Sequence, residues 1–481
     1  MSLHPADITI IAVYLAGMLG VGVWVSRKIG GFDDFFVAGG RMSTPILVGT
    51  LVSTYYGLDV TFGSSETAYL EGVAAFCAYS APFYLAYVAM AMLVAPRLKR
   101  LPVKSLPEAM GYCYGPTARV AAAAASFVYS APILAIAGMG IIAHVFFDIP
   151  EWVGAVAGAS LALIYTVLGG LLADAVTDAF QFAVMCVTLA IAAGAAMLEV
   201  GGPTELAARL PAETFAPFGT LGTTEVLVFA TAALTPLVEP AFYQRTFAAI
   251  DARRVVRALL IGVVLWMAYD WLVVYMGIIG QDMVASGALP ADMDASEVLL
   301  HTAAHLLPAG LLGLFLAGCL AAAMSTIDSY ALIAAGNIVY DAWQPLARRT
   351  VSDRALLLWT RLLTGVTIAF SIWLSLQFER LRDAWIFMAT ILLSTALVPM
   401  LAALFVLRER RPRAGSFAAV AGLAAALGLF VGFTLFGVEA DDTVTLDLGF
   451  SLIREEAVLV TLPISAVAFA VGYALDRSKH P

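Results

Sequence analysis

The stretch AAAMSTIDS, residues 321–329, lies inside a long apolar segment that begins near Leu311. Small residues surround its polar side chains and would let another helix approach closely. An intramembrane carboxylate is costly and marks a functional site by default, and clustered hydroxyl, carboxylate and carbonyl oxygens suit a hard cation such as sodium. The alternative is that the hydroxyls bond to carbonyls four residues earlier and only bend the helix. The polar side chains fall within about 1.2 turns of a helix and are Ser325, Thr326, Asp328 and Ser329.

The composition indicates a polytopic membrane protein. Of 481 residues, 61% are hydrophobic and 13% are charged, and the mean hydropathy is +0.90. Soluble domains carry ~25% charged residues, and a chain that crosses lipid this often is expected to be all-α. The first apolar stretch has no basic leader and no cleavage site, so we expect a retained helix. Four scattered cysteines show neither metal-ligand nor disulfide spacing: Cys77, Cys113, Cys186 and Cys319.

Thirteen apolar stretches are long enough to cross a hydrocarbon core of ~30 Å. With the N-terminus outside, 22 of the 26 basic residues fall in inner segments, which predicts an N-outside, C-inside orientation. The second and ninth stretches are too long for one perpendicular span and imply tilt, a break or an extension. The predicted spans are 7–25, 43–71, 76–96, 118–147, 151–172, 176–199, 223–246, 256–280, 301–339, 355–378, 384–408, 416–437 and 456–476.

Spans two to six (residues 43–199) and spans seven to eleven (residues 223–408) form two groups of five. Because five is odd, the second group enters the membrane with the opposite orientation, which is the arithmetic of an inverted repeat. Helix 7–25 is then an extra N-terminal helix, and 416–476 holds two extra C-terminal helices. We expect residues 1–481 to form a single transmembrane domain with a binding site near its midplane.

The first span of each group contains helix-breaking residues. STYYGLDVTFGSSE, residues 53–66, carries two glycines and Asp59 at hydrocarbon depth, and LTPLVEPAFYQR, residues 234–245, carries two prolines and Glu239. Unwound backbone is tolerated at that depth where it lines a cavity, and its carbonyls can coordinate an ion. Two ordinary kinks are the alternative, but they account poorly for breaks at corresponding positions.

Four motifs together resemble those of the sodium:solute symporters, which share the leucine-transporter fold. They are FFVAGGR (35–41), YTVLGGLLADAVTDAFQ (165–181), the QR of FYQRTFAA (242–249) and AAAMSTIDS. The resemblance covers nearly the whole chain. It implies cation-coupled uptake by alternating access, with thirteen helices and a five-plus-five inverted core.

The resemblance also implies a sodium site where the broken second span meets the ninth. Its ligands would be the hydroxyls of Ser325 and Thr326 and the carbonyl of Ala322. Helical geometry agrees, because residues three and four positions apart share one face of a helix. The carbonyls of Ser53 and Tyr56 would complete the site from the second span.

A second sodium site, found in some members of that family, would use Asp178 and Ser329. Asp328 stands where those members carry another serine. Its carboxylate would therefore either ligate the second sodium or form a hydrogen-bond or charge network that replaces it.

In this fold the solute lies beside the break in the second span. Three carboxylates and several aromatic rings, with no Lys or Arg in the same segments, favour a cationic or amine-bearing solute, because desolvated cation–π contacts are worth about 2 kcal/mol or more. Zwitterionic amino-acid-like and neutral solutes stay open, since membrane aromatics commonly serve packing or the interface. The candidate substrate residues are Tyr55, Asp59, Val60, Tyr84, Tyr87, Glu239, Trp266, Tyr269 and Asp270.

Two other functional classes compete with a symporter. An enzyme is not expected, because no HExxH, GxSxG or paired His and Cys lies in a span. A channel would pass current far above stoichiometric flux, and a sensor would carry an output domain, whereas few residues follow the last span. We expect no cofactor other than Na⁺ as coupling ion, and as partners a small solute, Na⁺ and the lipid bilayer, but no nucleic acid. The short loops favour the bacterial cytoplasmic (inner) membrane, and the oligomeric state does not follow from the sequence.

Overall fold

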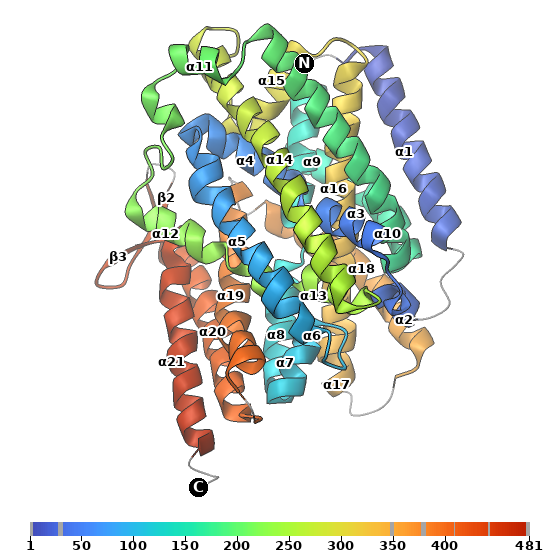
Figure 1. Ribbon diagram of the computed structural model, residues 1–481, viewed down its shortest axis with the longest axis vertical. Coiled ribbons are helices and arrows are strands. Elements are labelled where there is room, and N and C mark those ends of the chain that lie inside the picture. The colour runs from blue at the N-terminus through green and yellow to red at the C-terminus, as the bar shows by residue number, and fades with distance from the viewer. Residues whose placement is uncertain are drawn as a thin grey trace.

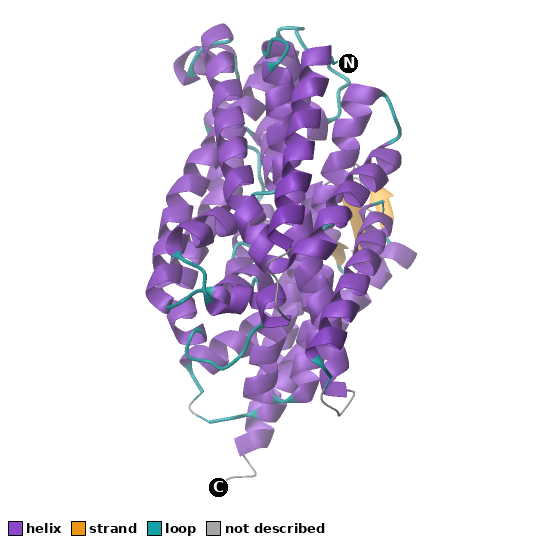
Figure 2. Cartoon of the chain, turned by 90° about the vertical axis from the view of Figure 1, so that its right-hand side faces the viewer, coloured by secondary structure: helices purple, strands orange, loops and turns teal. Residues whose placement is uncertain are grey.

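The computed structural model describes residues 3–26, 32–346, 351–376, 381–407, 409–440 and 443–477, without the side chains at 22, 23, 25, 26, 32–34, 59, 164–169, 172, 173, 381–383 and 440. Helices make up most of this part of the chain (Figure 1). The two ends of the chain lie at opposite ends of the long axis in both views (Figures 1 and 2). A helix pairs its own backbone groups, which is what a chain surrounded by lipid requires.

Ten helical segments of the described chain are long and apolar enough to cross a membrane. This confirms a multi-span helical protein, whereas the number thirteen and the orientation stay predictions. The other three predicted spans coincide with shorter pieces, described below. The ten segments are Ala75–Leu98, Pro116–Phe147, Asp174–Glu199, Thr223–Ala248, Ala252–Ala285, Leu311–Leu346, Asp353–Ser375, Ala384–Phe405, Pro412–Phe436 and Arg454–Arg477.

The predicted span 43–71 is interrupted at its centre. Helix α3 (Thr44–Tyr55) and helix α4 (Leu58–Glu71) are separated by Tyr56 and Gly57. Tyr56 has φ −105° and ψ 66°, and Gly57 is extended at φ −79° and ψ −169°. Neither residue is helical, so the chain leaves one helix and starts another within residues 53–66, where a break was predicted.

The predicted span 223–246 is broken as well. Helix α12 (Thr223–Ala232) is followed by the 3-10 turn η5 (Thr235–Leu237) and helix α13 (Pro240–Ala248). Proline is favoured in the first turn of a helix because its missing N–H is unpaired there anyway. Pro240 opens α13 in this way, and the Glu239 side chain caps the helix by accepting a hydrogen bond from the Phe242 N–H at 2.7 Å.

A third interruption was not predicted. Helix α8 (Pro116–Tyr129) and helix α9 (Ile133–Phe147) are separated by residues 130–132. Pro132 cannot donate a backbone hydrogen bond, and it disfavours the helical conformation at the preceding residue. The segment therefore bends at Ser130–Pro132, which the sequence analysis treated as continuous.

The boundary predicted after residue 172 and the overlong predicted span 301–339 both lie close to interruptions of a helix. Helix α10 (Glu151–Glu199) contains Gly170 at φ 55° and ψ −175°, a conformation that suits glycine, so the predicted spans 151–172 and 176–199 meet at a turn there. The overlong predicted span 301–339 is divided into α15 (Val298–Leu306) and α16 (Leu311–Gly336).

Close packing of α16 depends on its small residues. It contacts α10, α3, α9 and α1 (Pro5–Ser26), and residues 321–335 are buried. A Cβ added at Gly318 would lie 2.0 Å from Thr188 Oγ1 of α10, and one at Gly336 would lie 2.2 Å from the Phe36 ring. Only glycine permits these approaches of α16 to α10 and to Phe36.

A small antiparallel sheet, not predicted, joins the last two helices. Its order is β1-β2-β3, with Glu439 opposite Val444 and Leu446 opposite Leu452. The remaining elements are α2 (Phe32–Val37), η1 (Ala38–Gly40), η2 (Ala75–Ser80), α5 (Ala81–Ala89), η3 (Met90–Val94), α6 (Ala95–Leu98), α7 (Leu106–Tyr114), α11 (Pro203–Arg209), η4 (Ala212–Phe215), α14 (Ala252–Ala285), η6 (Ala295–Glu297), η7 (Asn337–Trp343), α17 (Gln344–Leu346), α18 (Asp353–Ser375), α19 (Leu381–Phe405), α20 (Pro412–Phe436), β1 (Val438–Ala440), β2 (Thr443–Asp447), β3 (Ser451–Ile453), η8 (Arg454–Glu456) and α21 (Ala457–Arg477).

Candidate functional site

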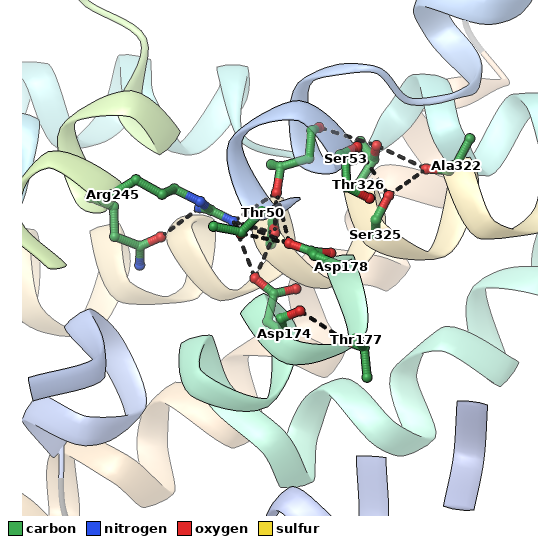
Figure 3. Close-up of polar contacts among 12 residues, drawn as sticks. Thr50, Ser53, Asp174, Thr177, Asp178, Arg245, Ala322, Ser325 and Thr326 are labelled. Atoms are coloured by element: carbon green, nitrogen blue, oxygen red, sulfur yellow. Dashed lines mark hydrogen bonds and ion pairs between the residues drawn. The ribbon is translucent and has the colours of Figure 1, made fainter. Parts of the chain in front are cut away.

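Five oxygen atoms gather where the end of α3 meets the middle of α16 (Figure 3). The Ser325 hydroxyl donates to the carbonyls of Ser53 and Ala322, each at 3.1 Å. The Thr326 hydroxyl donates to the carbonyl of Ala322 at 3.0 Å and to that of Thr54 at 3.3 Å. We call these five atoms the α3–α16 oxygen cluster.

The break after α3 explains why its carbonyls are available. The last four carbonyls of a helix have no intrahelical partner, and Ser53 and Thr54 belong to this last turn. The hydroxyls of α16 supply the missing donors. Carbonyl and hydroxyl oxygens, all of them neutral, form the donor set that hard cations prefer.

The structure brings together four of the five predicted sodium ligands. Ser53, Ala322, Ser325 and Thr326 all contribute to the α3–α16 oxygen cluster. Thr54, which was not predicted, supplies the carbonyl that Thr326 contacts. The break in span two was the signal for it, because every carbonyl on the last turn before a break is a candidate.

A second polar cluster lies beside the first, on the faces of α3, α10 and α16 that meet (Figure 3). Asp178 Oδ2 accepts the hydroxyl of Thr50 at 2.6 Å and that of Thr54 at 3.2 Å. Asp174, one turn earlier on α10, accepts the hydroxyl of Ser329 at 2.6 Å. All of these side chains are buried.

The guanidinium of Arg245 occupies the centre of this second cluster. Its Nη2 lies 2.8 Å from Thr54 Oγ1, 2.5 Å from Ser329 Oγ and 3.1 Å from Asp174 Oδ2. Nη2 is also 3.2 Å from Thr50 Oγ1 and 4.0 Å from Asp178 Oδ2. A buried charge has to be paired and hydrogen-bonded, and these five residues around Arg245, the Arg245 cluster, meet that requirement.

Two of the three residues predicted for a second sodium site belong to the Arg245 cluster, and the third does not. Asp178 and Ser329 belong to the Arg245 cluster. Asp328 is also buried. Neither Arg245 nor Asp174 was predicted as a site residue, although both lie in motifs that carried the family resemblance, the QR pair and the segment 165–181.

A cavity with a volume of about 60 Å³ lies next to the α3–α16 oxygen cluster. Its wall combines the α3–α4 break, the bend between α8 and α9, and parts of the η2–α5 segment, α14, α16 and α19. Thr326 belongs both to this wall and to the oxygen cluster. The wall residues are Tyr55, Tyr56, Val60, Tyr79, Ser80, Phe83, Tyr87, Tyr129, Ala131, Pro132, Ile133, Leu134, Ala135, Asp270, Thr326, Tyr330, Trp385 and Met388.

Asp270 is the only charged residue among those that line the cavity in the described part of the chain. The hydroxyls of Tyr56, at 2.8 Å, and of Tyr84 both donate to its Oδ2. Its Oδ1 is buried and has no hydrogen-bond partner among the described residues. The two tyrosines hold the carboxylate in place in the cavity wall.

The predicted substrate residues divide into wall residues and residues behind the wall. Tyr55, Val60, Tyr87 and Asp270 line the cavity. Of the other five, four lie behind the wall. The side chain of the fifth, Asp59, lies outside the described residues.

Four predicted substrate residues support the wall from behind. Trp266 is fully buried and stacks on Tyr56, with ring centroids 5.7 Å apart. Tyr84 contacts Asp270, as described above, and Tyr269 contacts the Thr61 hydroxyl at 3.1 Å. Glu239 caps α13 and accepts the hydroxyl of Tyr330 at 2.9 Å, so it joins the break in span seven to α16.

The wall also contains residues that sequence reasoning missed. Tyr129 and residues 131–135 come from the unpredicted bend between α8 and α9, and Trp385 comes from α19. The proline at 132 was a usable signal for the bend. Nothing local distinguishes Trp385 from an ordinary lipid-facing or packing aromatic.

Comparisons with known proteins agree with this architecture. The model of the sodium:solute symporter family matches residues 35–425. Sodium/myo-inositol cotransporter 2 of Rattus norvegicus is 26% identical over 208 residues, which is 42% of this chain and 31% of that protein, so the match spans under a third of that relative's length. The sodium/proline symporter of Haemophilus influenzae is 23% identical over 400 residues, 77% of each protein.

A solved structure shows the same fold over almost the full length. A substrate-bound, outward-open Na⁺-coupled sialic acid symporter matches with a TM-score of 0.79, covering 98% of both chains at 18% sequence identity. At this identity the similarity shows the fold alone.

Proposed function

Because the chain belongs to the sodium:solute symporter family, a family of transporters and not of enzymes, we propose that it carries a small organic solute into the cell together with sodium, by alternating access. One observation carries this proposal. Thr326 belongs both to the α3–α16 oxygen cluster and to the wall of the cavity. An ion bound by the cluster and a solute in the cavity would therefore share a residue, which is the contact that coupling needs.

The proposed topology has thirteen spans, with the N-terminus outside and the C-terminus inside, around a five-plus-five inverted core between one N-terminal and two C-terminal helices. Three observations support it: the ten long apolar segments, the location of the chain ends at opposite ends of the long axis, and the fold similarity over 98% of the chain. The bacterial cytoplasmic membrane is the proposed location.

Sodium entry would supply the driving force. One sodium ion that moves down a potential of 100 mV releases ~2.3 kcal/mol, before its concentration gradient is added. An ion can bias the conformational equilibrium only if it binds one state better than another. The ligands of the α3–α16 oxygen cluster come from two helices, so any motion of α3 against α16 would change the affinity for the ion.

The proposed solute carries an amine or another cationic group. Asp270 places a carboxylate in the cavity wall, and no Lys or Arg belongs to that wall among the described residues. Six tyrosines and a tryptophan also belong to the wall, and such rings attract ammonium groups. An anion would meet the Asp270 carboxylate without a compensating positive charge.

Transport by purified protein in liposomes tests this proposal. An inward sodium gradient, with the membrane potential set by potassium and valinomycin, should drive saturable uptake of one member of a panel of amines, amino acids, polyols and carboxylates. Uptake without dependence on sodium would refute the symport. Sodium-dependent uptake of a neutral polyol with no response to amines would refute the cationic solute and leave the symport standing.

Asp270→Asn tests the role of the carboxylate. Loss of one partner from a buried charge pair costs about 2–5 kcal/mol, so we expect the solute Kd to rise by roughly thirtyfold or more. Asp282→Asn is the matched control, because Asp282 lies on the same helix but pairs with Arg209 at 2.9 Å, away from the cavity. An unchanged solute affinity in Asp270→Asn would remove Asp270 from the binding site.

A further inference from the structure

A groove with a volume of about 440 Å³ lies where the turn between α7 and α8 faces the start of α20. It shares no lining residue with the cavity beside the α3–α16 oxygen cluster, so it is not part of the proposed ion and solute sites. We call it the α7–α20 groove. Residues 111–117 form one wall, and the other wall consists of Arg410, Pro412, Arg413, Ser416 and Phe417.

The two walls are joined by Tyr114, a buried residue at the end of α7. A Cβ added at Gly415 would lie 2.1 Å from the Tyr114 ring, so glycine is what lets α20 approach α7 this closely. The Ser416 hydroxyl donates to the Tyr114 carbonyl at 3.4 Å, and the Tyr114 hydroxyl donates to the Pro399 carbonyl of α19 at 2.7 Å. These contacts fix α7 relative to α20, so the groove is largely preformed, as small-ligand sites commonly are.

The charged side chains that line the groove are all positive. Arg410 and Arg413 belong to its wall, and no Asp or Glu does so in the described part of the chain. The guanidinium carbon of Arg410 lies 5.0 Å from the centre of the Tyr112 ring. This cation–π contact holds the charge of Arg410 against the wall that α7 provides.

Two acidic residues of the same region already have other partners. Glu409 pairs with Arg411 at 3.2 Å. Asp476, at the end of α21, accepts two backbone N–H groups at the start of α20, at 2.9 and 3.2 Å, and so caps that helix. The charges of Arg410 and Arg413 are therefore left for an anion from outside the chain, and a guanidinium matches the oxygens of a phosphate group.

The α7–α20 groove lies at the ends of two membrane-spanning segments. Pro116 is the first residue of the segment Pro116–Phe147, and Pro412 is the first residue of Pro412–Phe436. Both prolines line the groove, which places it at the level of the lipid headgroups. Phe417, five residues further along α20, also lines the groove and is 42% exposed, so the site continues from charged to apolar surface.

We propose that the α7–α20 groove binds the headgroup of an anionic phospholipid, with its phosphate on the guanidinium groups of Arg410 and Arg413 and an acyl chain along Phe417. Basic residues next to a membrane-spanning helix attract anionic lipids. A zwitterionic headgroup carries the same phosphate beside a quaternary ammonium, which two arginines would repel. The binding site goes beyond the proposed function and does not depend on the identity of the solute or of the coupling ion.

Thermal unfolding of the purified full-length protein in detergent micelles tests the proposal. Three probes are titrated: dioleoyl phosphatidylglycerol, dioleoyl phosphatidylcholine, and potassium phosphate against potassium chloride of equal ionic strength. Phosphatidylglycerol should raise the melting temperature saturably, and phosphatidylcholine should have little effect. Equal stabilisation by both lipids would overturn the proposal. Stabilisation by inorganic phosphate, with no further effect of phosphatidylglycerol, would overturn the lipid as the ligand and identify a site for free phosphate.

The variants Arg410→Gln and Arg413→Gln, alone and combined, test the assignment of the two charges. The apparent dissociation constant for phosphatidylglycerol should rise about fivefold for each arginine removed and about thirtyfold in the double variant, the change expected for basic side chains near an anionic membrane surface. Arg411→Gln is the matched control, because it removes the same charge from the same segment, whereas Arg411 pairs with Glu409 and does not line the groove. Equal losses in Arg411→Gln and Arg410→Gln would mean a diffuse effect of charge and would overturn the groove as the site.

Thr117→Glu tests the groove from its opposite wall and covers the case in which the arginine variants do not fold. Thr117 is exposed and lines the groove, and an acidic residue in the first turn of α8 suits the helix dipole, so the fold should be retained. The new carboxylate would compete with the lipid phosphate for the arginines, and the response to phosphatidylglycerol should be lost. Thr117→Gln, of the same size without the charge, should keep the response. A wild-type response in folded Thr117→Glu protein would contradict the proposal.

Discussion

Replacement of Thr326 by alanine is the sharpest test of the α3–α16 oxygen cluster. The change removes one of its five oxygen atoms, the one that lies 3.0 Å from the Ala322 carbonyl and 3.3 Å from that of Thr54. A hydrogen bond to a charged group is worth about 1.5–3 kcal/mol, and we take the same range for one oxygen ligand of the ion. The sodium Kd should then rise by roughly 10- to 150-fold, since 1.4 kcal/mol corresponds to a factor of ten.

Thermal unfolding in the presence of sodium provides the assay. At a sodium concentration of 100 times the wild-type Kd, binding stabilises the folded state by about 2.7 kcal/mol. A variant whose Kd is a hundredfold weaker would be stabilised by only about 0.4 kcal/mol at the same concentration. The sodium-dependent rise in melting temperature should therefore shrink to a small fraction of its wild-type size.

Two control variants separate ion binding from general destabilisation. Thr326→Ser keeps the hydroxyl and should keep most of the sodium effect. Thr364→Ala removes a buried hydroxyl that donates to the carbonyl four residues earlier, at 2.9 Å, in α18, and should leave the sodium response unchanged. Wild-type sodium affinity in Thr326→Ala would refute the assignment of this cluster as the ion site.

Three further predictions concern the framework of the site. Tyr330→Phe removes the donor to Glu239 Oε1 and should lower the free energy of unfolding by about 1–3 kcal/mol. The effect should largely disappear in a Glu239→Ala background, which has no acceptor for the hydroxyl, when both are compared by thermal unfolding. Gly318→Ala places a Cβ 2.0 Å from Thr188 Oγ1 and should cost about 1–3 kcal/mol by overpacking, whereas alanine at position 365, which has no neighbour within 4 Å, should be neutral in the same assay. The Arg254 backbone N–H donates to the exposed Asp251 carboxyl and lowers its pKa. The charged Asp251 therefore stabilises the fold above the ordinary pKa of 3.8, and this stabilisation is lost as the pH falls through the lowered pKa. The melting temperature of Asp251→Asn should lack this acid-dependent part.

Local sequence was sufficient for the features whose cost is local. A long run of apolar residues has to enter lipid as a helix, whatever the rest of the chain does, so the multi-span class followed from hydropathy alone. A glycine or proline inside such a run interrupts the helix for reasons of backbone geometry, and the breaks lie at Tyr56–Gly57 and before Pro240, as expected. The hydroxyls of Ser325 and Thr326 could be named as candidate ligands from the sequence, although the sequence also allowed the bonds to a carbonyl of their own helix that the structure contains.

The two carboxylates of spans seven and eight show where local reasoning stopped. Glu239 and Asp270 were both candidate substrate residues. In the structure Glu239 caps the helix that Pro240 opens, whereas Asp270 belongs to the wall of a cavity. The Glu-Pro pair already had the pattern of a helix start, but no feature around Asp270 indicates which neighbours surround it.

The sequence by itself determined the class of protein, the residues that interrupt its helices and the oxygen-bearing turn of α16. Only the tertiary structure decided which groups those oxygens meet: the Thr54 carbonyl for Thr326 and the Arg245 guanidinium for Ser329. The physical reason is separation along the chain. Hydropathy and backbone geometry act within a few residues, whereas these contacts join positions far apart, and the angles at which α3, α10, α13 and α16 pack decide which of them form.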